Sequence, residues 1–230
     1  MTARVVLPGR LPNTRDLGGL RRADGAVLRD RRLVRTAALV GLDAGVADAL
    51  HDELGPAVYV DLRTDREVDR DGGPDALLER GWRWRRIPVF DLVPDEEQDS
   101  LRRCARFMPL YLATAAEVAG LLGDGPVVVG CAVGKDRTGI IMTVLLHWLG
   151  VPPADIAADY VRSNGFLADG RHLLPPLWQD PATRLTQVHE RFCLGAIDLL
   201  GAQGAAAEPP AHLADLDLWT LRSSVGAGSA

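Results

Sequence analysis

The sequence predicts an α/β fold in which a central, partly parallel sheet is flanked by helices. Short runs of β-branched residues alternate along the chain with segments of helical periodicity, and one strand, loop and helix follow each other directly. The chain has 230 residues, enough to bury a substantial core, and it contains no internal repeat. We therefore expect residues 1–230 to form a single domain.

The first half of the chain is predicted to hold turns, one short helix and two strands. Residues 1–35 mix Gly, Arg and Asp and are expected to be rich in turns. Apolar residues recur at helical spacing over 43–54, and Gly55 follows as a stop signal. Residues 57–63 (AVYVDLR) predict a buried strand that runs into a polar loop, and residues 82–89 predict a second strand.

The second half is predicted to be mainly helical around one further strand. Residues 126–129 (PVVV) form a short β-branched run, which is typical of a buried strand. Four segments carry apolar residues at helical spacing, namely 95–123, 138–149, 153–164 and 183–200. The Ala/Pro-rich stretch that begins near residue 202 predicts a flexible tail over 202–230.

Composition excludes several classes of protein. A net charge of −5 gives no general reason to bind nucleic acid. The longest apolar stretch, 140–149, is too short to span a bilayer, and no charged-then-apolar leader opens the chain, so a cytoplasmic location is expected. The three cysteines are odd in number and widely spaced, and the five histidines show no pairing. We therefore expect no disulfide framework, no metal and no cofactor.

The loop between the strand at 126–129 and the following helix has the features of an anion-binding site. Its sequence over residues 130–137 is GCAVGKDR. Backbone N–H groups of a tight loop, together with a helix N-terminus, attract an anion, and this field favours the thiolate form of Cys131. Arg137 supplies a planar, two-pronged donor to phosphate oxygens. A thiolate beneath a phosphate, with this arginine six residues on, is the arrangement for in-line attack on phosphorus and a phosphocysteine intermediate.

Two other interpretations of this loop fit less well. A lone cysteine after a strand is often a buried small apolar residue, but that interpretation leaves Arg137 unexplained. A nucleotide-binding loop has four residues between its glycines and Ser or Thr after its lysine. Gly130 and Gly134 are separated by three residues, and Asp136 follows Lys135, so the nucleotide pattern fails on both counts.

Residues 131–139 (CAVGKDRTG) resemble the signature of the cysteine-based protein tyrosine phosphatase superfamily. They are most similar to its bacterial tyrosine/serine branch, which includes dual-specificity and lipid phosphatases. Other segments resemble further blocks of this branch in the expected order, so that the likeness covers roughly residues 10–200. These segments are residues 13–19 (NTRDLGG), 35–39 (RTAAL), 61–63 (DLR) with Glu67, and 159–164 (DYVRSN).

The resemblance implies a fold, an activity and a set of roles. The fold is the phosphatase-like central sheet with a strand–loop–helix active site, and the partner is a phosphorylated substrate, with no cofactor. Cys131 is implied as the nucleophile and Arg137 as the clamp on the phosphate. Asp136 is the first candidate for the general acid, and the runner-up is Asp91, in the loop after Pro88. The residues implied to contact phosphate or substrate are Ala132, Val133, Gly134, Lys135, Thr138 and Arg63.

Three positions keep alternatives open. Lys135, the single lysine among 26 basic residues, is interpreted either as a contact to acidic substrates or as a solvent-facing side chain. Arg63 either braces the loop or touches substrate, or it forms a structural ion pair, for which Glu67 is a candidate. Gly130 replaces the histidine that most of the superfamily carries before the cysteine and that orders the loop, so rate and pH optimum are expected to differ. The short tail predicts a small lid or none.

These observations favour a metal-independent phosphoric monoester hydrolase. Its substrate class is phosphotyrosine or phosphoserine, a phosphoinositide, or a small phosphorylated metabolite. The alternative function is a non-catalytic phosphate-binding module, which retention of Cys131, Asp136 and Arg137 together argues against. Sulfur transfer also uses cysteine in an anion loop, but the DRTG ending of this loop favours phosphate.

Overall fold

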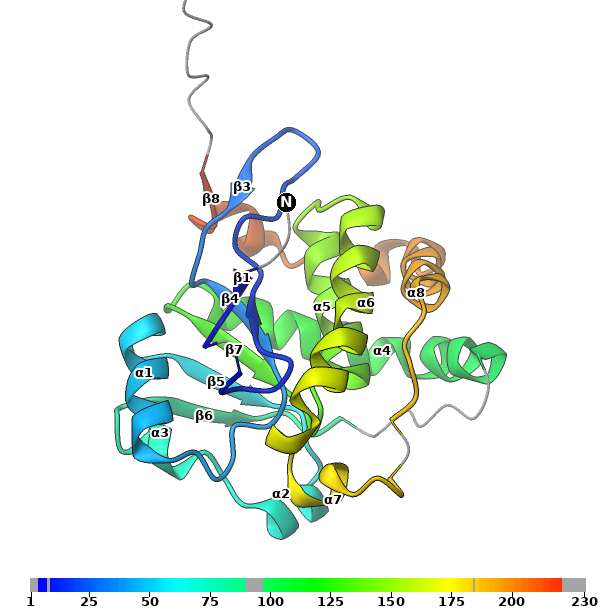
Figure 1. The fold of residues 1–230 in the computed structure, drawn as a ribbon. Coiled ribbons are helices and arrows are strands. Elements are labelled where there is room, and N and C mark those ends of the chain that lie inside the picture. The colour runs from blue at the N-terminus through cyan, green and yellow to red at the C-terminus, as the bar shows by residue number, and fades with distance from the viewer. Residues whose placement is uncertain (1–3, 8, 90–96, 184, 221–230) are drawn as a thin grey trace, which may run out of the picture.

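A six-stranded mixed sheet forms the centre of the computed structural model, which describes residues 4–7, 9–89, 97–183 and 185–220 (Figure 1). In sheet order the strands are β1 (Arg4–Val5), β2 (Arg15–Asp16), β4 (Leu33–Thr36), β7 (Val127–Gly130), β5 (Val58–Asp61) and β6 (Arg83–Arg86). Strands β4, β7, β5 and β6 run parallel, whereas β1 and β2 are antiparallel to their neighbours. The predicted α/β class with a partly parallel sheet is confirmed. The strands predicted at 57–63 and 82–89 are present but shorter, and the strand predicted at 126–129 is shifted by one residue.

Helices cover both faces of this sheet (Figure 1). Those of the described residues are α1 (Ala44–Leu54), α2 (Asp65–Asp71), α3 (Asp75–Leu78), α4 (Glu97–Leu121), α5 (Asp136–Trp148), α6 (Pro153–Gly170), α7 (Pro176–Gln179) and α8 (Glu190–Ala202). Because successive side chains of a strand point to opposite faces of the sheet, alternate strand residues pack into two separate hydrophobic cores. Val34 and Val128 pack with α1 and α3, whereas Val60 and Val129 pack with α4, α5, α6 and α8.

A local signal explains where α1 begins, and burial explains the apolar sequence of α5. Asp43 caps α1 by accepting a 2.8 Å hydrogen bond from the Val46 N–H, as expected of a short polar side chain before a helix. Helix α5 is buried on all sides over 137–146, which matches its almost continuous apolar sequence. It begins at Asp136, two residues before its predicted start, so that Asp136 and Arg137 lie in its first turn.

The last predicted helix starts later than its apolar spacing indicates. Helix α8 begins at Glu190 rather than at residue 183. The carbonyls of the preceding segment accept hydrogen bonds from side chains instead of from a helix: Arg171 donates to Thr183, Lys135 to Thr186 and Asn164 to Val188. These contacts compete with the intrahelical ladder and hold residues 185–189 as an extended strap.

The segment after residue 202 differs from the flexible tail predicted for it. Up to Thr220 it is docked on the body through two short 3₁₀ helices, Gly204–Ala207 and Ala211–Asp215. The Trp148 indole N–H donates to the Ala207 carbonyl at 2.6 Å, and Leu213 is buried. Strand β8 (Trp219–Thr220) then pairs with β3 (Val27–Leu28) in a separate ribbon. Residues 221–230 lie outside the described residues.

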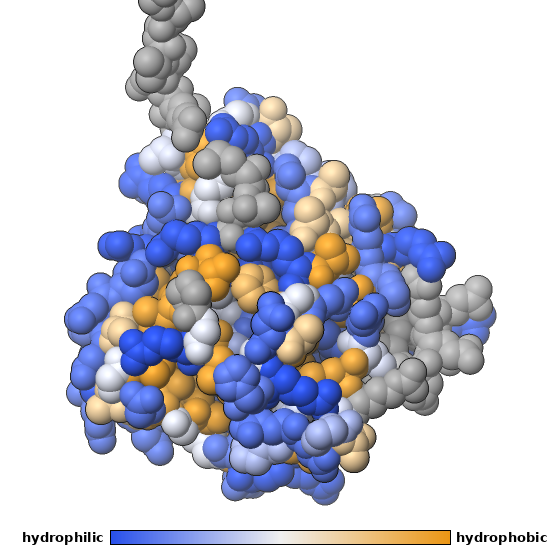
Figure 2. Space-filling view, viewed as in Figure 1, coloured by the Kyte–Doolittle hydropathy of each residue, from blue (hydrophilic) through white to orange (hydrophobic). Residues whose placement is uncertain are grey.

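The surface is predominantly hydrophilic in the face that Figure 2 shows, with hydrophobic side chains in smaller groups between the polar ones. Among the described residues, the large hydrophobic side chains that are exposed are Leu78 and Leu177. None of the described helices is long and apolar enough to cross a membrane.

Candidate active site

The strand register places the candidate loop between the ends of two neighbouring strands. Gly130, the last residue of β7, lies beside Thr36 of β4 and Asp61 of β5 in the parallel ladder. The carboxyl ends of three strands therefore meet at one edge, which is where open α/β sheets bind their ligands. Cys131 follows directly and is buried at the base of the loop, with 1% of its surface exposed.

Two glycines let the loop pass close to the end of β4. Gly134 has φ of +68°, and a Cβ there would lie 2.3 Å from the Thr36 carbonyl oxygen, so only glycine fits. At Gly130 a Cβ would lie 3.0 Å from the Ala37 carbonyl oxygen and 3.0 Å from the Thr36 Cγ2 atom. The space that a histidine at 130 needs is thus filled by residues 36 and 37, which gives the physical reason for this departure from the superfamily.

The side chains of Ala132 and Val133 face away from the anion side of the loop. Both are buried in a small cluster with Ala37, Leu167 and Leu174. Any phosphate contact from these two residues therefore comes from their backbone amides, as the resemblance implies.

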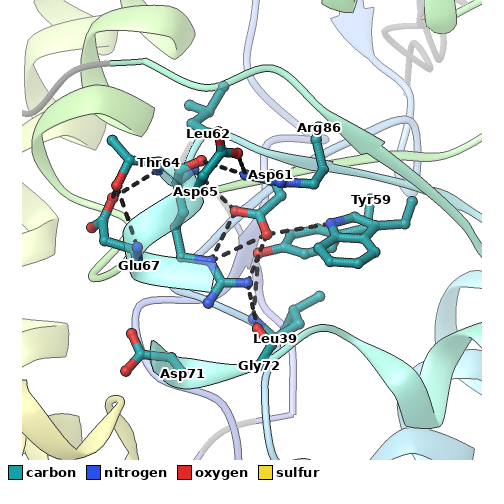
Figure 3. Close-up of polar contacts among 12 residues, drawn as sticks. Leu39, Tyr59, Asp61, Leu62, Thr64, Asp65, Glu67, Asp71, Gly72 and Arg86 are labelled. Atoms are coloured by element: carbon teal, nitrogen blue, oxygen red, sulfur yellow. Dashed lines mark hydrogen bonds and ion pairs between the residues drawn. The ribbon is translucent and has the colours of Figure 1, made fainter. Parts of the chain in front are cut away.

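Arg137 is held by Glu67 through two parallel hydrogen bonds. Its Nη1 donates to Oε2 at 2.7 Å and its Nη2 to Oε1 at 2.6 Å, the fork-on-fork geometry of a strong ion pair. Glu67 is in turn fixed by Thr64, because the two residues form the capping box of α2 (Figure 3). Burial alone would raise the pKa of Glu67, but Arg137 and the Thr64 donors outweigh it and lower the pKa to about 2.

Arg63 forms the structural ion pair that was one of its two alternatives, but its partner is Asp61 and not Glu67. Its Nη2 donates to Asp61 Oδ2 at 2.7 Å and to the Gly72 carbonyl at 3.0 Å. Asp61 also accepts from the Trp84 indole, so this cluster ties β5 to β6 and α2 (Figure 3). Arg63 is fully buried, and within the described residues its side chain donates hydrogen bonds to Asp61 and Gly72 and not to the 130–137 loop.

The Lys135 side chain does not point to solvent, which was one of its two alternatives. Its side chain is 3% exposed, and Nζ donates to the Thr186 carbonyl at 2.6 Å and to the Thr186 hydroxyl at 3.1 Å. The Asp136 carboxylate lies 3.3 Å from the same ammonium and is 22% exposed. The strap at 185–189 therefore crosses the loop beside the candidate acid.

Thr138 and Asp91 are two predicted site residues for which the described residues show no contact that fits the implied role. The Thr138 hydroxyl, implied to contact phosphate or substrate, is buried and has no hydrogen-bond partner within the described residues, Cys131 included. Asp91 falls in residues 90–96, which lie outside the described residues. Within the described ranges no three His, Cys, Asp or Glu side chains gather as a metal site.

A buried cluster behind the loop was not foreseen as part of the site. Arg15 Nε lies 2.6 Å from Asp159 Oδ1 and Arg35 Nη1 lies 2.7 Å from Oδ2, so one carboxylate pairs with two guanidiniums. Burial and the neighbouring Arg35 lower the pKa of Arg15 to about 9. Ser163 and Asn13 complete the cluster. All of these residues lie in the sequence blocks at 13–19, 35–39 and 159–164. The resemblance of these blocks to the phosphatase branch is the signal in the sequence by which the cluster could have been found.

The proteins that this chain resembles are phosphatases. A family model described as the tyrosine phosphatase family matches residues 8–205. H16_A0669 of Cupriavidus necator, provisionally named a tyrosine-protein phosphatase, is 30% identical over an alignment of 172 positions that covers 67% of this chain and 61% of that protein. The triple specificity protein phosphatase PtpB of Mycobacterium tuberculosis is 30% identical over 197 residues, 69% of this chain and 68% of that protein.

The chain thus spans about six tenths of the length of the Cupriavidus protein. Among solved structures, TpbA of P. aeruginosa matches with a TM-score of 0.47 and 17% identity, covering 72% of this chain and 80% of that chain.

Proposed function

Because this chain belongs to the tyrosine phosphatase family, we propose that it hydrolyses phosphoric monoesters through a phosphate held covalently on Cys131. The observation that carries this proposal is the pairing of Arg137 with Glu67. A guanidinium that is 2% exposed and fixed by two hydrogen bonds stands at the end of a loop whose base is a buried cysteine. A pre-oriented guanidinium in the same loop as a sulfur nucleophile suits the charge that develops on a transferring phosphoryl group.

The remaining cysteines are unsuited to this role. Burial raises the pKa of Cys104 to about 12 and that of Cys193 to about 11, so both stay protonated at neutral pH. Cys131 is the cysteine that follows a parallel strand and precedes a helix N-terminus, where backbone dipoles favour an anion.

The proposed first step transfers the phosphoryl group to sulfur. The Cys131 thiolate attacks phosphorus, the ester P–O bond breaks, and the leaving oxygen takes the proton of Asp136. Asp136 is suited to this because it lies in the first turn of α5, next to the loop, and its carboxyl group is partly exposed. In the second step water attacks phosphorus, its proton passes to the Asp136 carboxylate, and the S–P bond breaks to release phosphate and restore the thiolate.

We assign the substrate to phosphomonoesters in general, covering phosphotyrosine or phosphoserine, phosphoinositides and small phosphorylated metabolites. The name of the PtpB relative, a triple specificity phosphatase, supports a broad range. Measuring kcat/KM for a panel of these compounds would rank them as substrates.

Hydrolysis of an aryl phosphate tests the proposal. Activity should persist in chelator, be blocked by vanadate and vanish in Cys131→Ser, whereas Cys193→Ala serves as the matched control and should stay active. Full activity in Cys131→Ser would refute the mechanism. Phosphate binding without turnover of any ester in the wild type would establish the non-catalytic module instead.

A further inference from the structure

Four consecutive carbonyls of the loop accept hydrogen bonds from groups outside it. Their acceptor–donor pairs are Ala132 O with Ala38 N at 3.2 Å, Val133 O with Asn13 Nδ2 at 2.9 Å, Gly134 O with Arg35 Nη2 at 2.9 Å, and Lys135 O with Gly139 N at 2.9 Å. Two of these donors are backbone amides, which any residue supplies. The other two are side chains of Asn13 and Arg35, which come from segments far away in the sequence.

The direction of each carbonyl decides the direction of the next amide. A trans peptide places its C=O and N–H on opposite sides, and the described residues contain no cis peptide. Since Asn13 holds the Val133 carbonyl and Arg35 holds the Gly134 carbonyl, the N–H groups of Gly134 and Lys135 point away from the buried cluster.

We propose that Asn13 and Arg35 are positioning residues that turn the amides of Gly134 and Lys135 toward the phosphate. This rests on the proposed function, because it takes phosphate as the ligand of the loop. Neither side chain touches the phosphate in this proposal, and both act through a peptide plane.

The peptide between Val133 and Gly134 needs such an external anchor. Glycine tolerates positive and negative φ about equally, so rotation of this peptide meets little resistance from residue 134 itself. The histidine that orders the loop elsewhere in the superfamily has no counterpart at Gly130, where residues 36 and 37 fill the space. The hydrogen bond from Asn13 to the Val133 carbonyl supplies such a constraint.

The orientation of the Asn13 amide follows from its neighbours. Arg15 Nη1 donates to Asn13 Oδ1 at 2.6 Å, and a guanidinium has only donors, so the amide oxygen must face Arg15. The NH₂ group is then left for the Val133 carbonyl. Asp159 orients Arg15 and Arg35 together, so one carboxylate on α6 sets both anchors of the loop.

Calorimetric titration with inorganic phosphate tests this directly, because the dissociation constant is obtained separately from the fraction of protein that is folded. Asn13→Asp keeps the oxygen that Arg15 needs and replaces the donor with an acceptor, while Asn13→Ala removes the donor without adding charge. Each should raise the Kd for phosphate at least about tenfold, as expected when an oxyanion donor is misdirected. A purely structural role would lower stoichiometry and melting temperature and leave Kd unchanged.

Asn164→Ala is the matched control. Asn164 also holds backbone through its amide, donating to the Val188 carbonyl and accepting from the Val188 N–H, but it contacts the strap and not the loop. It should lower stability and leave the Kd for phosphate unchanged.

Arg35→Lys gives a second, independent variant if Asn13 variants do not fold. A lysine keeps a positive charge for Asp159 but lacks the two separate nitrogens that reach Asp159 and Gly134, so phosphate affinity should again fall. Wild-type Kd in folded Asn13→Asp and Asn13→Ala, or in Arg35→Lys, would overturn the proposal while the proposed hydrolysis stands. A wild-type chain that binds no phosphate would overturn both.

Discussion

The guanidinium of Arg137 and the carboxylate of Glu67 face each other at 2.6 and 2.7 Å, although 70 positions separate them in the sequence. The pair links the start of α5 to the first turn of α2, and the Thr64 capping box holds its acidic member. Arg137 is therefore oriented before any phosphate arrives, which reduces the entropy cost of ordering its side chain.

Replacing Glu67 by Gln should lower kcat/KM by about 10- to 100-fold, because the neutral amide cannot accept both guanidinium bonds and Arg137 loses its fixed direction. Steady-state kinetics on an aryl phosphate measure the effect. Glu117→Gln removes the acidic partner of Arg85 in an exposed ion pair and should leave kcat/KM unchanged. Equal rates in Glu67→Gln and wild type would contradict the role given to the pair.

Glu67 should also contribute to the pH dependence of stability. Its pKa in the folded chain is about 2, below its ordinary value of 4.5, so its stabilising effect is complete above about pH 4.5 and is lost as pH falls toward 2. Urea unfolding at several pH values between 5 and 2 should show a smaller decline in Glu67→Gln than in wild type. Parallel declines in the two proteins would show that other carboxylates account for the whole effect.

Asp136→Asn should impair hydrolysis of an alkyl phosphate by about 100-fold, because a poor leaving group needs a proton from the acid. A nitrophenyl phosphate, whose leaving group departs as the anion, should be affected much less. The comparison of the two substrates in one variant separates loss of the acid from general damage. An unimpaired alkyl phosphatase activity would refute Asp136 as the acid and direct attention to Asp91.

Lys135→Ala should weaken binding of a doubly phosphorylated substrate more than that of a small aryl phosphate. For Lys135 to reach a second anionic group, its ammonium must exchange the Thr186 oxygens for that group. Thr186→Val removes only the hydroxyl acceptor, so it should free Lys135 partly and lower KM for the acidic substrate. The ratio of KM values for the two substrates in both variants measures this, and an unchanged ratio would show that the lysine serves the strap alone.

Gly130→Ala should cost about 1–3 kcal/mol of unfolding free energy, since its methyl group meets the Ala37 carbonyl and the Thr36 side chain at 3.0 Å. Gly130→His, which restores the residue common in the superfamily, should cost more. Gly120→Ala is the control, because nothing lies within 4 Å of its Cβ position in α4, and it should be neutral or slightly stabilising. Chemical denaturation gives the three values, and a stable, faster Gly130→His enzyme would contradict this account.

The features that the sequence predicts well are those with local causes. The apolar spacing of 43–54 and the Asp43 cap lie within one helix, and the run of valines before Cys131 lies within one strand, so each can be found without knowing the rest of the fold. The spacing from Cys131 to Arg137 is likewise a property of one loop. These patterns predicted the fold class and the place of the candidate site.

The features that escaped prediction depend on partners distant in sequence. Glu67 was considered as a partner for Arg63, yet it pairs with Arg137, because β5 and β7 are neighbours only in the folded sheet. Apolar spacing over 183–200 predicted a helix that starts too early. The apolar pattern contains no information about the distant side chains that donate to the Thr183, Thr186 and Val188 carbonyls.

The sharing of Asp159 between Arg15 and Arg35 has a consequence for how the chain acquires its site during synthesis. A ribosome delivers both arginines first, the loop at 130–137 next, and Asp159 last. Until helix α6 emerges, two guanidiniums that must be buried side by side have no counter-charge between them. A nascent fragment that ends after α5 carries the whole signature motif but lacks the carboxylate that pairs with both arginines. On the proposal above, we expect such a fragment to bind phosphate more weakly than the full chain.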